Sequence, residues 1–130
     1  MDQPKITPDA PELRAAEPPA PDPLVAAFLN YLGAERNDSP HTLEGYRMDI
    51  EQFSRTVLKT DAAEKAVDWN DVSVHDARMF VVSLQNDKLT RTSISRKMSA
   101  LRSFYRYLVR EGRVEGNPFS GLPRTPVPLS

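Results

Sequence analysis

Residues 92–112 read TSISRKMSALRSFYRYLVREG, and this stretch decides which fold the chain can adopt. At about 100° per residue, its apolar side chains recur at alternating spacings of four and three and form one continuous stripe. The stripe consists of Ile94, Met98, Leu101, Tyr105 and Leu108, widened by Phe104 on one side and Val109 on the other. The pattern predicts a long amphipathic helix, capped by Thr90 or Thr92 and ended by Gly112, that lies against a hydrophobic core.

The opposite arc of this helix carries arginines and small hydroxyl side chains but no carboxylate. Its members are Ser95, Arg96, Ser99, Arg102, Ser103, Arg106 and Arg110. Solvated helix faces usually mix both signs of charge, because pairs of opposite charge one turn apart stabilise them. Residues 91–113 contain seven cations and one anion, a net charge of +6, whereas the whole 130-residue chain has a net charge of −1. This local excess of positive charge indicates a polyanionic partner.

Three further helices are predicted upstream, each from a capping residue followed by an amphipathic pattern. The first begins with Asp22 and Pro23 and buries Val25, Phe28, Leu29 and Leu32. The second begins with Ser39 and Pro40 and buries Leu43, Tyr46, Ile50, Phe53 and Val57. The third begins with a Ser73–Asp76 capping pattern and buries Val74, Ala77, Phe80, Val81 and Leu84. Because no strand pattern is present, the sequence predicts an all-α protein, a bundle of four helices.

The two ends of the chain differ in composition from this bundle. Residues 1–21 are acidic and rich in Pro and Ala without a hydrophobic period, so we expect a disordered tail. Residues 22–119 form the predicted folded domain. Residues 120–130 contain three prolines and are predicted to be an extended linker.

The second helix has an outward arc that contains a glycine. This arc consists of His41, Gly45, Met48, Gln52 and Arg55. A glycine in a helix interior costs roughly 1 kcal/mol relative to alanine. Gly45 is therefore either a position where a groove wall or another backbone comes close, or a tolerated defect.

The sequence contains no pattern typical of catalysis or of metal or cofactor binding. It has no cysteine, and its two histidines, His41 and His75, lie in different predicted helices, where both are interpreted as surface residues. Its acidic residues are interpreted as helix caps and solvent-facing charges. No catalytic residue, metal, cofactor or small-molecule ligand is predicted. No apolar run approaches the roughly 20 residues needed to span a bilayer, and we expect a cytoplasmic protein that does not contact a membrane.

Nucleic acid is the polyanion that suits the cationic arc best. Arginine guanidinium groups match phosphate oxygens and guanine edges, and a major groove about 12 Å wide admits one helix. An acidic protein partner, bound by a helical interaction module, is the alternative from another class of function.

Two long blocks of the sequence then resemble a known family. Residues 39–53 read SPHTLEGYRMDIEQF and residues 90–119 read TRTSISRKMSALRSFYRYLVREGRVEGNPF. Both resemble the N-terminal core-binding domain of tyrosine recombinases, particularly the Xer recombinase and phage-integrase group. The resemblance covers residues 22–126 approximately, and it implies a SAM-like orthogonal bundle that holds one side of double-stranded DNA.

The resemblance also implies which residues contact DNA. On the second helix they are His41, Thr42, Gly45 and Met48. On the fourth helix they are Thr92, Ser93, Arg96, Lys97, Ser99, Arg102, Ser103 and Arg106, where Arg102 and Arg106 are taken from the cationic arc itself. The two outward arcs, derived from periodicity alone, already contain most of these positions.

The resemblance implies the DNA-binding part of a recombinase and not its catalytic part. In that family the tyrosine nucleophile and its supporting residues lie in a further C-terminal domain. We therefore expect no catalytic role for this chain, a recombination half-site as its partner, and contacts with other protomers at synapsis. A non-catalytic regulator of recombinase sites remains an alternative to a part of an enzyme.

Overall fold

In the computed structural model, which describes residues 21–121, the chain forms four α-helices and one short 3₁₀ helix without any strand in that range. The helices are α2 (Pro23–Ala34), α3 (Pro40–Thr56), α4 (Val74–Asn86) and α5 (Arg91–Arg110), with η1 (Trp69–Asp71) before α4. The prediction of an all-α bundle of four helices is confirmed. The predictions of a disordered tail and an extended linker fall on residues outside this range, except at Pro21, Ser120 and Gly121.

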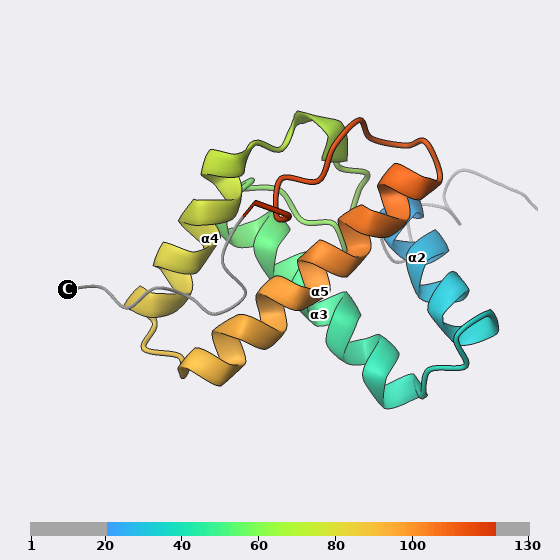
Figure 1. Ribbon diagram of the computed structural model, residues 1–130, viewed down its shortest axis with the longest axis horizontal. Coiled ribbons are helices and arrows are strands. Elements are labelled where there is room, and N and C mark those ends of the chain that lie inside the picture. Colours follow the sequence, from blue (N-terminus) through green and yellow to red (C-terminus); the bar gives the residue numbers. More distant parts are fainter. Residues whose placement is uncertain (1–20, 122–130) are drawn as a thin grey trace, which may run out of the picture.

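Helix α5 is the central element of the bundle. Figure 1 shows it crossing α3, with α2 towards one end of α5 and α4 towards the other. Helices α2, α3 and α4 all contact α5, and α3 also contacts both α2 and α4. The predicted stripe on α5 is what they cover, because Leu101, Phe104 and Leu108 are completely buried.

The helix boundaries follow from side chains that satisfy free backbone groups. Ser39 accepts a hydrogen bond from the Thr42 N–H, and Thr90 accepts one from the Ser93 N–H. Ser73 and Asp76 form the complete reciprocal capping box that the sequence predicted. Gly112 ends α5 with φ of 72°, a conformation that glycine adopts without steric cost.

Asp22 does more than cap α2. Its Oδ1 accepts hydrogen bonds from the N–H groups of Leu24 and Val25, and its Oδ2 accepts one at 2.6 Å from the N–H of Val67. The Asp22 N–H donates to the Ala62 carbonyl at 2.7 Å. One buried carboxylate therefore fixes both the start of α2 and the long connection between α3 and α4.

Aromatic rings fill the centre of the bundle. Phe104 lies 5.4 Å from Phe28 on α2 and 5.0 Å from Trp69 of η1, measured between ring centroids. Tyr105 donates its hydroxyl hydrogen to the Trp69 carbonyl at 2.7 Å, and burial raises the pKa of this phenol. Phe119, which follows α5 by several residues, is completely buried against Phe53 and Tyr105.

Some predictions about burial were wrong. Val74 and Val109 are exposed, and each lies at or near an end of its helix. Asp49 and Glu51 on α3 are buried, although the acidic residues were interpreted as helix caps and solvent-facing charges. The apolar residues Leu29, Leu43, Tyr46, Val57 and Val81 are partly buried and pack against the core, as their apolar stripes predicted.

Candidate nucleic-acid interface

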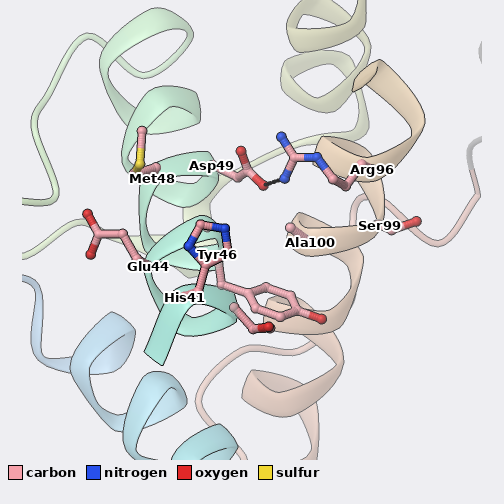
Figure 2. Close-up of a pocket in the computed structure, with 10 residues that line it drawn as sticks. His41, Glu44, Tyr46, Met48, Asp49, Arg96, Ser99 and Ala100 are labelled. Atoms are coloured by element: carbon pink, nitrogen blue, oxygen red, sulfur yellow. Dashed lines mark hydrogen bonds and ion pairs between the residues drawn. The ribbon is translucent and has the colours of Figure 1, made fainter. Parts of the chain in front are cut away.

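A groove of about 540 Å³ lies between the first half of α3 and the first half of α5. Its lining includes six of the predicted DNA-contacting residues, namely His41, Thr42, Gly45, Met48, Arg96 and Ser99. Glu44, Tyr46, Asp49 and Ala100 complete the lining. Figure 2 shows the α3 and α5 side chains on either side of this groove. The fold thus brings together two outward arcs that lie about fifty residues apart in the sequence.

The α3 side of the groove is open and weakly charged. Met48 is 54% exposed, an unusual position for a large apolar side chain. An added Cβ at Gly45 would meet no atom within 4 Å, so nothing inside the fold requires a glycine there. The Ser39 hydroxyl donates to Thr42 Oγ1 at 3.0 Å, which orients the threonine at the groove entrance.

Asp49 joins the two sides of the groove. Its side chain is 3% exposed, and its two oxygens accept hydrogen bonds from Arg96 Nη1 at 2.8 Å and from Lys97 Nζ at 2.9 Å. Figure 2 shows the Arg96 guanidinium reaching across from α5 to this carboxylate. Because charge-assisted hydrogen bonds are short and strong, α3 and α5 are held at a defined separation here.

Asp49 also determines what its two cationic partners can do. The Arg96 side chain remains 58% exposed, so it can present its remaining N–H donors to a ligand in the groove. The Lys97 side chain is only 15% exposed, and its ammonium group lies against Asp49. Arg96 is therefore a better-placed candidate for a groove contact than Lys97.

Asp49 is the groove residue that periodicity missed. The second-helix block contains it, three residues after Tyr46, so a signal was present in the motif. The interpretation of the acidic residues as helix caps and solvent-facing charges did not use this signal.

The predicted contacts at the start of α5 lie outside the groove lining. Thr92 is exposed in the first turn, and Ser93 is half-buried, with its Oγ accepting a hydrogen bond from the Thr90 hydroxyl at 3.0 Å. Both residues lie on the same helix, one turn before Arg96. They stay predictions as DNA contacts.

Arg102 does not belong to an exposed cationic arc, and that part of the prediction was wrong. The residue is only 8% exposed, and its Nε donates to the Phe119 carbonyl at 3.4 Å. Asn117 in turn donates its side-chain N–H to the Arg102 carbonyl at 3.2 Å. The segment after α5 folds back over this arginine. Helical periodicity cannot predict this contact, because it describes only residues of one helix.

Ser103 and Arg106 line a second, smaller hollow between α2 and α5, together with Arg36 and Arg110. Arg36 lies in the turn after α2 and was not predicted as part of any site. A basic residue in a short turn before a capped helix carries no periodic signal.

An ion-pair cluster on α3 flanks the groove. Arg47 contacts the carboxylates of both Glu44 and Glu51, and the hydrogen bond to Glu44 is the main cause that raises the pKa of Arg47. The same hydrogen bond lowers the pKa of Glu44 and so favours its ionised form. The Glu44 charge at the groove rim is thus partly neutralised by Arg47.

Within residues 21–121, no cluster of three or more His, Asp or Glu side chains could hold a metal ion. The same part of the chain has no helix that combines the length and apolar character needed to cross a membrane.

Comparison with known proteins gives one family and many relatives. The family model for the phage integrase N-terminal SAM-like domain matches residues 25–112. The chain is 44% identical over 107 residues to the tyrosine recombinase XerC of Oceanobacillus iheyensis, covering 81% of this chain and 34% of that protein. It is 43% identical over 105 residues to XerC of Pseudomonas aeruginosa, covering 77% of this chain and 32% of that protein.

The matches cover only one part of the relatives, which are longer proteins. The chain spans about a third of the length of the curated relatives that it matches. No solved structure gives a significant match. The family match includes both helices that line the groove, and the resemblance that the sequence indicated is confirmed. The chain belongs to the family of phage-integrase N-terminal SAM-like domains.

Proposed function

We propose that this chain is the DNA-binding domain of a Xer-like tyrosine recombinase. In this proposal α3 and α5 enter the major groove of a recombination half-site, and the other recombinase protomers are its partners at synapsis. No catalytic step is assigned to residues of this chain. Cleavage and rejoining of DNA belong to other parts of the recombinase.

The observation that carries the proposal is the groove with Arg96 held at its edge. Arg96 is anchored at one nitrogen by the buried Asp49 carboxylate and is otherwise exposed. An arginine that is already oriented loses less conformational entropy on binding, so it can recognise a base edge or phosphate more tightly. His41, Thr42 and Ser99 add hydrogen-bonding groups along the same groove.

Two kinds of contact would contribute to the affinity. About four to six phosphate contacts would make log K fall with log salt concentration, with a slope of roughly −0.9 per contact. Base contacts from Arg96 would add discrimination of about 1–3 kcal/mol against a wrong base pair.

A binding experiment with one variant and one matched control tests the proposal. The full chain first selects duplexes from a random pool. The affinities of wild type, Arg96→Ala and Arg78→Ala for the selected and for random duplexes are then measured. Arg78 is an exposed arginine on α4 that does not line the groove, so it controls for loss of one positive charge. We expect Arg96→Ala to reduce the preference for selected over random duplex by roughly tenfold or more, and Arg78→Ala to leave it unchanged.

Two results would count against the proposal. If Arg96→Ala and wild type prefer selected over random duplex equally, Arg96 does not recognise bases. Failure of the wild-type chain to bind any duplex at low salt would favour an acidic protein partner instead.

A further inference from the structure

A second hollow, of about 100 Å³, lies between α2 and the second half of α5. Its wall carries three guanidinium groups (Arg36, Arg106, Arg110), a serine hydroxyl (Ser103) and two phenol rings (Tyr31, Tyr107). No carboxylate from the described part of the chain lines it. The hollow is small, cationic and rich in hydrogen-bond donors, which are the properties of an anion site.

Arg110 forms a fixed wall of this hollow. Its Nη1 donates to the Tyr31 hydroxyl at 3.2 Å, and its Nη2 lies 3.2 Å from a Glu111 carboxylate oxygen. Its guanidinium carbon lies 4.5 Å from the Tyr31 ring centroid and 5.4 Å from that of Tyr107. These contacts engage Arg110, so it shapes the hollow and is not the main candidate for holding a ligand.

Arg36 and Arg106 each have guanidinium N–H donors that are not used in hydrogen bonds within residues 21–121. Arg36 forms an ion pair with Asp38, with 3.7 Å between Nη2 and Oδ2, and makes no hydrogen bond in the described part of the chain. Arg106 is exposed and has no hydrogen bond or ion pair with residues 21–121. Two guanidinium groups from different elements therefore line one hollow without a carboxylate bound between them.

The position of the hollow identifies the anion. Arg96, Ser99, Ser103, Arg106 and Arg110 follow one another at alternating spacings of three and four, so they share one face of α5. Arg106 lies ten residues beyond Arg96, which is about 15 Å along the helix axis. A major groove is about 12 Å wide, so a helix that contacts bases near Arg96 reaches the bordering sugar–phosphate backbone near Arg106.

We propose that Arg36 and Arg106 together bind one backbone phosphate of the DNA, just beyond the edge of the groove that α5 enters. This inference rests on the DNA-binding function proposed above and adds a defined phosphate site to it. Arginine forks fit a phosphate bidentately, and Ser103 can donate a further hydrogen bond. The site joins the turn after α2 to the DNA, so it fixes the angle at which α5 lies in the groove.

The test measures binding of the full chain to a mixed-sequence duplex about three helical turns long, over a series of salt concentrations. Arg36→Ala, Arg106→Ala and the double variant are compared with wild type and with Arg78→Ala. Each single variant should lose about tenfold in affinity at low salt, as expected for one charge-assisted contact. Since both arginines bind the same phosphate, the double variant should lower the salt slope by about 0.9 and not by twice that value.

Other results would contradict the proposed phosphate site, and each would have a different meaning. If wild type binds DNA and the arginine variants behave like Arg78→Ala, no phosphate is held here, although the chain still binds DNA. A slope loss of about 1.8 in the double variant would show two separate phosphates. A loss seen only when a second protomer binds would assign the hollow to a carboxylate of the neighbouring protomer. Absence of DNA binding by wild type would refute the proposed function itself. Both arginines are exposed, and thermal unfolding followed by circular dichroism verifies that each variant is folded.

Discussion

At the scale of single residues, the Asp49 carboxylate links the two helices that form the groove. It accepts hydrogen bonds from Arg96 and Lys97 while almost fully buried, so its position is fixed by the fold. A buried carboxylate that keeps two cationic partners is retained at a cost in desolvation. We infer that its contribution includes the orientation of Arg96 as well as stability.

Replacing Asp49 by Asn tests both contributions, the stability of the fold and the orientation of Arg96. The side chain keeps its shape but loses the charge that binds Arg96 and Lys97. We expect the free energy of unfolding to fall by about 1–3 kcal/mol, because hydrogen bonds to a charged group are lost. We also expect the preference for selected over random duplex to fall, although Arg96 itself is unchanged. Urea unfolding and competition binding measure the two effects.

Glu51→Gln is the matched control for this variant. Glu51 is the other buried carboxylate of α3, and its arginine partners, Arg47 and Arg55, lie on the same helix. Since Glu51 does not line the groove, its substitution should affect stability and leave the duplex preference as in wild type. A duplex preference in Asp49→Asn equal to that of wild type would show that Asp49 does not position Arg96.

At the scale of secondary-structure elements, α3 presents a glycine to the groove where a helix former would be more stable. Gly45→Ala should raise the free energy of unfolding by about 0.5–1 kcal/mol, because no atom lies within 4 Å of the new Cβ. If DNA comes close to this backbone, the same methyl group should weaken DNA binding. The variant is thus expected to be more stable and to bind more weakly, by thermal unfolding and by anisotropy titration respectively.

Gly33 on α2 provides the contrast. A Cβ at Gly33 would lie 3.3 Å from Leu43 Cδ1, so this glycine is explained by helix packing inside the fold. Gly33→Ala should therefore gain less stability than Gly45→Ala and leave DNA binding unaffected. Unchanged DNA affinity in Gly45→Ala would mean that Gly45 is only a tolerated defect.

The helices themselves could be predicted from the sequence because their signals are local. Capping residues such as Ser39 and Ser73 lie within three residues of the N–H groups that they satisfy, and the stripe on α5 repeats with the helical period. The groove required one further step, since two outward arcs had to be placed side by side. Periodicity predicted each arc separately, whereas the packing of α3 on α5 depends on the tertiary fold.

The features that could not be predicted depend on contacts between residues far apart in the sequence. Asp49 is buried because Arg96 and Lys97, almost fifty residues later, neutralise its charge. Arg102 is buried because residues 117–119 fold back over it. Neither contact lies within one helical turn of the buried residue. The amphipathic pattern therefore placed Arg102 on the outward arc, and Asp49 was interpreted with the other acidic residues as a helix cap or solvent-facing charge.

At the scale of the whole molecule, the fold extends past the last helix. The family match ends at residue 112, but the core includes Val114 and Phe119 from the segment that follows. Phe119 packs against Phe53 of α3 and Tyr105 of α5, with ring centroids 5.3 Å and 5.5 Å apart. This segment therefore connects both groove helices from the core side.

Phe119→Ala tests this structural role. Removing a completely buried phenyl ring should lower the free energy of unfolding by about 3–5 kcal/mol, a large part of the stability of a domain of this size. Val109→Ala, at an exposed apolar residue of α5, should change stability by less than about 0.5 kcal/mol. Similar unfolding curves for the two variants would show that the segment after α5 is not part of the cooperative core.

The central claim is that the surface formed by α3 and α5 binds DNA, and amide chemical shifts of the full chain during titration with duplex DNA test it most directly. We predict that the shifts change in residues 41–48 of α3 and along the outward face of α5 from Arg96 to Arg106, with α4 unaffected. Changes confined to α4, or no changes at saturating DNA and low salt, would contradict the account.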